Sequence, residues 1–155
     1  MASLARILRF RIELLTPIPD TAASMILLVE DNEDDVFLME RALRKASIQR
    51  PMHVAKDGRE ALKYLQAVGP YADRNSFPLP SLIFLDLKLP FVQGFQVLEW
   101  INQQPSLKQV PVVILTSSSE QSDRDKAEAL GARSFLVKPP TADMLRAVFQ
   151  SFPGN

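Results

Sequence analysis

The chain has 155 residues, with 18 basic and 18 acidic side chains, so its formal net charge is zero. This length suits one domain around one hydrophobic core, and the balanced charge gives no reason to expect nucleic acid as a partner. The chain contains no cysteine. That excludes disulfides and thiolate chemistry, and it suits a reducing compartment, so we expect a cytoplasmic location. No apolar run in the sequence is long enough to predict a membrane span.

The first 24 residues differ from the rest. Apolar residues and three arginines are interspersed over positions 4–15, and Pro17 and Pro19 would break any helix that follows. Two interpretations stay open: a frayed or disordered extension, and an amphipathic helix that binds a surface or a partner. We therefore expect an N-terminal extension over 1–24, a folded domain over 25–152 and a short tail over 153–155.

Apolar runs alternate with helical patterns along the folded part of the chain. The expected elements are, in order, a strand near 25–30, a helix near 34–46, a strand near 53–55, a helix near 59–67, a long loop over 69–80, a strand near 82–86, a helix near 94–103, a strand near 112–115, a helix near 122–130, a strand near 134–137 and a helix from about 141 to 152. Five strand–helix units with continuously apolar strands predict an α/β fold. It is a doubly wound, five-stranded parallel sheet with helices on both faces.

Polar, reactive residues stand where several of these strands end. Glu30 and Asp31 follow the first strand, Asp86 ends the third, and Thr116 and Lys138 follow the last two. Parallel strands bring their carboxyl ends to one edge of a sheet, where open α/β sheets bind ligands, so these side chains should converge. A single aspartate at a strand end is more often a turn former or a cap, so the argument depends on all of these positions together.

The chemistry of this set points to a metal ion and a phosphoryl group. Carboxylates packed together repel one another, and a divalent cation removes that conflict. Mg²⁺ suits one or two carboxylates plus a phosphate oxygen, and a spare aspartate can accept a phosphoryl group covalently. Lys138 would supply a positive charge to the new oxygens and Thr116 a hydroxyl.

Residues 25–150 resemble a receiver domain of two-component response regulators. The resemblance is carried by Glu30-Asp31, by Asp86 with Leu89-Pro90 and Gly94 behind it, by Thr116-Ser117 and by Lys138-Pro139. It implies a flavodoxin-like receiver fold with strand order 2-1-3-4-5, and a sensor histidine kinase as partner. It also implies that Asp86 is the phospho-acceptor, that Thr116 and Lys138 are its catalytic partners, and that Mg²⁺ is held by Glu30, Asp31, Asp86 and the backbone carbonyl of Lys88.

Two positions depart from the common pattern of that family. Glu30 replaces the commoner aspartate, and Phe135 stands where many members have a tyrosine. The resemblance implies that Thr116 and Phe135 form the switch pair, and that the side chains at Lys88 and Ser118 tune the lifetime of the phosphoryl group. The Lys-Pro peptide bond is usually cis in the family.

Three segments are similar to phytochrome-associated single-domain regulators: residues 29–35, 69–74 and 115–120. This similarity implies a bacterial phytochrome as the kinase. Phosphorylation should move Thr116 and Phe135, so we expect the helix near 122–130, the strand near 134–137 and the helix after 141 to form the surface that binds a second copy or another protein. We assign Asp35 to the N-terminus of its helix and His53 to packing rather than to the site.

The same residues bear on three other functions. A phosphatase with an aspartate nucleophile needs a second acid two residues later, where Lys88 stands. A flavodoxin needs a glycine-rich phosphate loop after the first strand, where residues 30–33 would repel a phosphate. A receiver-like scaffold that does not switch stays open. We expect a signalling switch, with no enzyme activity beyond its own phosphorylation and dephosphorylation.

Overall fold

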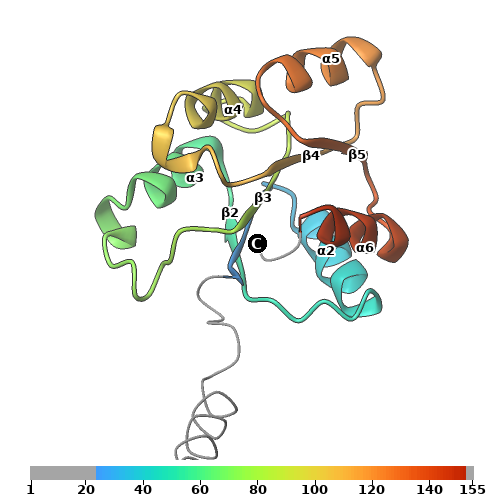
Figure 1. The fold of residues 1–155 in the computed structure, drawn as a ribbon, viewed down its shortest axis with the longest axis horizontal. Helices are drawn as coiled ribbons and strands as arrows, with labels where there is room; N and C mark the ends of the chain where they lie inside the picture. Colours follow the sequence, from blue (N-terminus) through green and yellow to red (C-terminus); the bar gives the residue numbers. More distant parts are fainter. Residues whose placement is uncertain (1–23, 153–155) are drawn as a thin grey trace, which may run out of the picture.

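The computed structural model describes residues 24–152, which form a parallel five-stranded sheet. The strands are β1 (Ile26–Val29), β2 (Met52–Ala55), β3 (Leu82–Leu85), β4 (Val112–Thr116) and β5 (Ser134–Val137). Their order across the sheet is β2-β1-β3-β4-β5, so the predicted doubly wound topology is confirmed (Figure 1). The expected extension, up to residue 23, and the expected tail at 153–155 lie outside the described residues.

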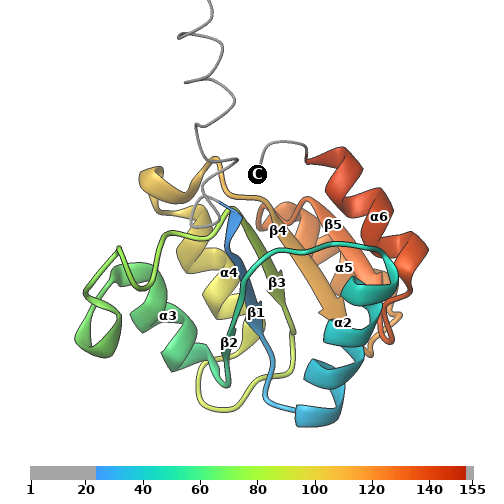
Figure 2. The same ribbon diagram turned by 90° about the horizontal axis from the view of Figure 1, so that it is seen from below.

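Helices cover both faces of this sheet. They are α2 (Glu33–Lys45), α3 (Gly58–Gln66), α4 (Gly94–Asn102), α5 (Gln121–Ala129) and α6 (Ala142–Ser151), with short 3-10 turns η2 (Gly69–Tyr71) and η3 (Pro105–Leu107). Helices α2 and α6 pack together on one face, and α3, α4 and α5 lie on the other (Figure 1 and Figure 2). Among the described residues, no helix has the length and apolar character needed to cross a membrane.

Burial on both faces explains the continuously apolar strands. In β1, Leu27 and Val29 pack into the core beneath α3, α4 and α5, whereas Ile26 and Leu28 pack beneath α2 and α6. All four β1 residues are buried, as are all residues of β3 and β4. A strand that is covered on both sides has no solvent-facing positions, and this is why strict apolar–polar alternation is missing from the sequence.

Side-chain caps fix where two of the helices begin. The Asn32 side chain accepts hydrogen bonds from the backbone N–H groups of Asp34 and Asp35, at 2.9 and 3.1 Å, and so starts α2. The Thr141 hydroxyl accepts from the backbone N–H of Met144 at 3.2 Å and so starts α6. Most element ends lie within one or two residues of those expected. The small differences arise because apolar periodicity alone does not show where the capping residues lie.

An aromatic cluster anchors the expected long loop to the sheet. His53 of β2 stacks on Tyr64 of α3, with 4.8 Å between ring centroids, and meets Tyr71 and Phe77 edge-on. The Arg74 guanidinium donates to the carbonyl oxygens of Tyr64, Leu65 and Phe77 at 2.8–3.1 Å. The loop is therefore tied to the end of α3, and His53 has the packing role expected of it.

Candidate functional site

Three carboxylates converge at the carboxyl edge of the central strands. Val29 of β1 pairs with Leu85 of β3, so the residues that follow them, Glu30 and Asp86, come side by side. One carboxylate oxygen from each of Glu30, Asp31 and Asp86 can be chosen so that all three lie within 4.8 Å of one another. Glu30 and Asp86 are 2% and 6% exposed, whereas Asp31 is exposed. An all-oxygen set with one side open to water fits a hard divalent cation that keeps some of its own waters.

Lys138 joins this group from the end of β5. Its ammonium contacts the carboxylate of Glu30, lies 2.8 Å from Asp35 Oδ2 and lies 3.1 Å from Asp86 Oδ2. Its backbone N–H donates to the carbonyl oxygen of Thr116 at 2.7 Å, which holds the residue at the same edge as the acids. The expected meeting of Lys138 with the acidic strand ends is thus observed.

Burial and charge perturb the protonation of two of these groups. Burial raises the pKa of Glu30 to about 7, although hydrogen bonds from Lys138 and from the backbone N–H of Asn32 act in the opposite direction. Burial also disfavours the charged form of Lys138, but its hydrogen bonds to Asp35 and Glu30, together with the negative charges of Asp86 and Glu30, outweigh that effect and leave the pKa of Lys138 above its ordinary value. The site therefore contains a permanent cation among acids that compete for it.

Thr116 ends β4 and is fully buried. Its hydroxyl oxygen accepts a hydrogen bond from the backbone N–H of Ser118 at 3.3 Å, and the Ser118 hydroxyl donates to Asp123 of α5 at 2.6 Å. Phe135 pairs with Ile114 in the sheet and is half-buried, with the Arg124 guanidinium 5.1 Å from the centre of its ring. The two expected switch residues therefore occupy neighbouring strands and are linked to α5.

A hydrogen bond to the Asp86 carboxylate and a cation–π contact with α3 hold the loop after Asp86. The backbone N–H of Lys88 donates to Asp86 Oδ1 at 3.3 Å, while the Lys88 residue itself is exposed. Phe91 has a positive φ of 66°, is 70% exposed and stacks on Arg59 of α3, whose guanidinium lies 3.4 Å from the centre of the ring.

The Lys138–Pro139 peptide bond is cis, as the resemblance implied.

Asp35 is a site residue that the sequence analysis missed. It does lie in the first turn of α2, as expected, but its carboxylate also reaches Lys138. Helical side chains lean toward the helix N-terminus, and α2 begins just after β1. This geometry directs a carboxylate in the first turn back toward the sheet edge that holds Glu30 and Lys138. It is the feature from which the contact of Asp35 could have been inferred.

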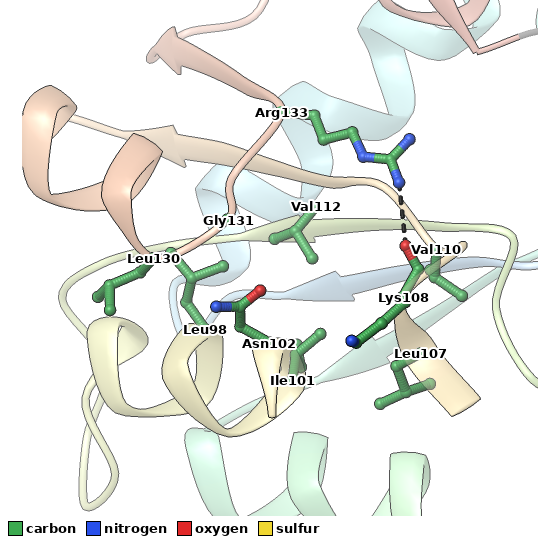
Figure 3. A pocket seen from close by; sticks show the side chains of 10 residues that line it. All are labelled: Leu98, Ile101, Asn102, Leu107, Lys108, Val110, Val112, Leu130, Gly131 and Arg133. Atoms are coloured by element: carbon green, nitrogen blue, oxygen red, sulfur yellow. Dashed lines mark hydrogen bonds between the residues drawn. The ribbon is translucent and has the colours of Figure 1, made fainter. Parts of the chain in front are cut away.

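A separate pocket of about 380 Å³ opens at the other edge of the sheet (Figure 3). Its lining includes Val112, the first residue of β4, together with Asn102 at the end of α4 and Gly131 before β5. Arg133 also lines the pocket, and its guanidinium donates to the carbonyl oxygen of Lys108 at 3.0 Å (Figure 3). Because the pocket lies at the amino end of β4, it is remote from the acidic group around Asp86.

Comparison with known proteins gives a consistent set of relatives. A family model described as "Response regulator receiver domain" matches residues 26–150. The response regulator Rcp1 of Synechocystis sp. is 40% identical over 114 residues, which cover 74% of this chain and 76% of Rcp1. The solved structure of its Mn²⁺-bound form is 36% identical, with a TM-score of 0.70 over 83% of this chain and 93% of that one.

Two further solved structures are phytochrome response regulators. The bacteriophytochrome response regulator AtBRR is 39% identical, with a TM-score of 0.73 over 84% of this chain and 92% of that one. The phosphorylated cyanobacterial phytochrome response regulator RcpA is 32% identical, with a TM-score of 0.73 over 84% and 94%. The chain thus belongs to the response regulator receiver domain family of two-component systems, and its homologues include phytochrome response regulators.

Proposed function

We propose that this protein accepts a phosphoryl group from a sensor histidine kinase onto Asp86, in a Mg²⁺-dependent reaction, and that the phosphorylated form changes its binding to partners. Phosphoryl acceptance is typical of the receiver family. One observation carries the proposal for these residues: an ammonium, Lys138, and two further carboxylates, Glu30 and Asp31, converge on Asp86 from the ends of two other strands, β5 and β1.

The proposed transfer is a displacement at phosphorus. A carboxylate oxygen of Asp86 forms the new O–P bond while the P–N bond of a phosphohistidine breaks, and the imidazole leaves with the bonding electron pair. Lys138 donates hydrogen bonds to the phosphoryl oxygens, and the Thr116 hydroxyl turns toward them. Lys88 and Ser118 stand two residues after Asp86 and Thr116 in the sequence, and their side chains would set how readily water removes the phosphoryl group.

Receiver domains bind a divalent metal at an acidic pocket, and the acidic group here fits that role. We assign Glu30, Asp31, Asp86 and the backbone carbonyl of Lys88 as the ligands of Mg²⁺. Bound there, the ion would neutralise the crowded carboxylates and draw a phosphoryl oxygen toward Asp86. The existence of a Mn²⁺-bound form of the relative Rcp1 supports the proposal that this chain binds a divalent ion.

The kinase we propose is a bacterial phytochrome, because several of the chain's relatives are phytochrome response regulators. The surface proposed to respond is formed by α5, β5 and α6, which contacts a second copy or another protein. The receiver domain would span residues 25–152 and act as a switch in the cytoplasm. No step of this scheme needs contact with nucleic acid.

A mass measurement tests the proposal. The protein is incubated with acetyl phosphate and Mg²⁺, and its intact mass is recorded alongside that of Asp86→Asn and of a sample treated with EDTA. We expect one phosphoryl adduct on the wild type and none on the two controls. An unmodified wild type would favour the scaffold interpretation, and an adduct on Asp86→Asn would place the acceptor elsewhere.

A further inference from the structure

Asp35 stands apart from the acids that surround the proposed metal position. It comes from α2 rather than from a strand end, and its Oδ2 lies 2.8 Å from the Lys138 Nζ. The Asp35 side chain is 31% exposed, whereas that of Lys138 is 10% exposed. Asp35 therefore reaches inward from the rim of the site to a cation that is nearly closed off from water.

The hydrogen-bonding capacity of Lys138 is fully used in this arrangement. An ammonium group has three N–H donors, and Lys138 has three carboxylate partners: Glu30, Asp35 and Asp86. A phosphoryl oxygen on Asp86 can gain a bond from Lys138 only if one of these partners gives way. The phosphoryl group and the three carboxylates therefore compete for the three N–H donors of Lys138.

The three partners differ in what they lose on release. Glu30 is buried, and without Lys138 its one remaining hydrogen bond among residues 24–152 is with the backbone N–H of Asn32. Asp86 is the proposed acceptor itself and stays beside its own phosphoryl group. Asp35 is the most exposed of the three, so water can hydrate its carboxylate once Lys138 leaves. Of the two partners that are not themselves phosphorylated, Asp35 is therefore the one that yields at the lower cost.

We propose that Asp35 is a positioning residue that holds Lys138 in the unphosphorylated protein and competes with the phosphoryl group for it. This inference rests on the proposed role of Asp86 as acceptor. Asp35 opposes phosphorylation in two ways: it occupies one donor of Lys138, and its negative charge lies close to an incoming anion. Removing that charge favours the phosphorylated state and prolongs it.

Beryllofluoride binding with Mg²⁺ measures this competition without a kinase. We compare the wild type with Asp35→Asn and with Asp34→Asn as the matched control. Asp34 lies in the same first turn of α2 and carries the same charge, but its carboxylate forms no ion pair among the residues that the structure describes. Fluorine NMR reports the bound analogue, and the side-chain ammonium signal of Lys138 is recorded before the analogue is added.

Asp35→Asn is expected to bind beryllofluoride about fivefold more tightly than Asp34→Asn, because an ion pair of this exposure contributes about 1 kcal/mol. The Lys138 signal should move in Asp35→Asn alone, which a general change in surface charge would not produce. Equal affinities in the two variants, or weaker binding by Asp35→Asn, would overturn the role of Asp35. If none of the three proteins binds the analogue, the proposed function itself fails. Asp35→Ser serves as a second variant in case Asp35→Asn is poorly folded.

Discussion

Gly94 packs directly against the backbone of Asp86. A β-carbon at position 94 would come 2.1 Å from the Asp86 carbonyl oxygen and 2.6 Å from the Leu87 Cα. The backbone N–H of Gly94 also donates to the Leu87 carbonyl oxygen at 3.1 Å. The first residue of α4 thus fixes the direction in which the chain leaves β3, and with it the position of the proposed acceptor.

Gly94→Ala is therefore expected to damage both folding and phosphorylation. A side chain forced against rigid backbone costs about 1–3 kcal/mol of unfolding free energy, and relief of the clash would shift Asp86 away from Lys138. Urea denaturation measures the first effect, and the rate of acetyl phosphate adduct formation measures the second. Gly69→Asn is the control, since no atom lies within 4 Å of an added β-carbon there and asparagine tolerates its positive φ. A normal phosphorylation rate in Gly94→Ala would refute this role of the contact.

Asp31→Asn should weaken Mg²⁺ binding and slow phosphorylation together, if Asp31 is a metal ligand as proposed. Removal of one of three carboxylates is expected to raise the Kd for Mg²⁺ by about tenfold, which corresponds to about 1.4 kcal/mol. Isothermal titration measures the affinity, and intact mass measures the reaction. Glu33→Gln is the matched control, because Glu33 lies in the same acidic run but outside the cluster. Unchanged Mg²⁺ affinity in Asp31→Asn would remove Asp31 from the ligand set.

Arg74→Ala is expected to release the loop that follows α3. The guanidinium donates hydrogen bonds to three carbonyl oxygens, two of them in the last turn of α3. Because these are charged hydrogen bonds, their loss together should lower the unfolding free energy by about 1.5–3 kcal/mol. The measurement is the unfolding free energy, together with hydrogen exchange in residues 69–80. Arg133→Ala removes a single exposed bond to a carbonyl and should cost about 0.5 kcal/mol or less. Equal losses in the two variants would show that Arg74 does not anchor the loop.

His53 should make stability fall as the solution is acidified. Burial lowers the pKa of His53 below its ordinary value of 6.5, with Glu60 acting in the opposite direction. The unfolded chain then takes up a proton at a higher pH than the folded protein, so the stabilisation present above pH 6.5 is lost as the pH falls toward the folded-state pKa. Between pH 7.5 and pH 5.5, the unfolding free energy of the wild type is therefore expected to fall by more than that of His53→Phe.

His53→Phe is the right comparison because Glu30 titrates in an overlapping range. The raised pKa of Glu30 makes its contribution to stability fall as the pH rises from 4.5 to about 7, which is the opposite direction. Glu30 is present in both proteins, so the difference between them isolates His53, the only histidine of the chain. If both proteins show the same pH dependence, His53 does not titrate differently in the two states.

Binding of beryllofluoride should move the amide NMR signals of Thr116, Phe135 and α5. The hydroxyl of Thr116 turns toward the new oxygens, which breaks its bond with the Ser118 N–H, and Phe135 then fills the space left behind. Stronger self-association or partner binding is expected to accompany these shifts. Residues around the remote pocket, such as Asn102, serve as the internal control and should stay in place. If Asp86 binds the analogue while the signals near Thr116 stay put, the protein is not a switch.

The strand ends could be predicted from sequence because each strand stops abruptly. Runs such as 82–85 are apolar on both faces and end in a charged residue, so their position in the sheet and the edge occupied by Asp86 follow from connectivity alone. The contact of Asp35 could not be predicted in the same way. It depends on the rotation of α2 about its axis, which is set by the Asn32 cap and by packing against α6, and an acidic first turn has a sufficient explanation in the helix dipole.

The hydrogen bond from the Lys138 N–H to the Thr116 carbonyl has a consequence for the speed of signalling. It ties the backbones of β4 and β5 together at the edge where the phosphoryl group would sit. A response at Thr116 must then occur by rotation of its side chain and adjustment of the loop to α5, motions that take nanoseconds to microseconds, rather than by sliding of strands. The time course of the signal would be governed by the arrival and loss of the phosphoryl group, with the protein conformation following at each moment.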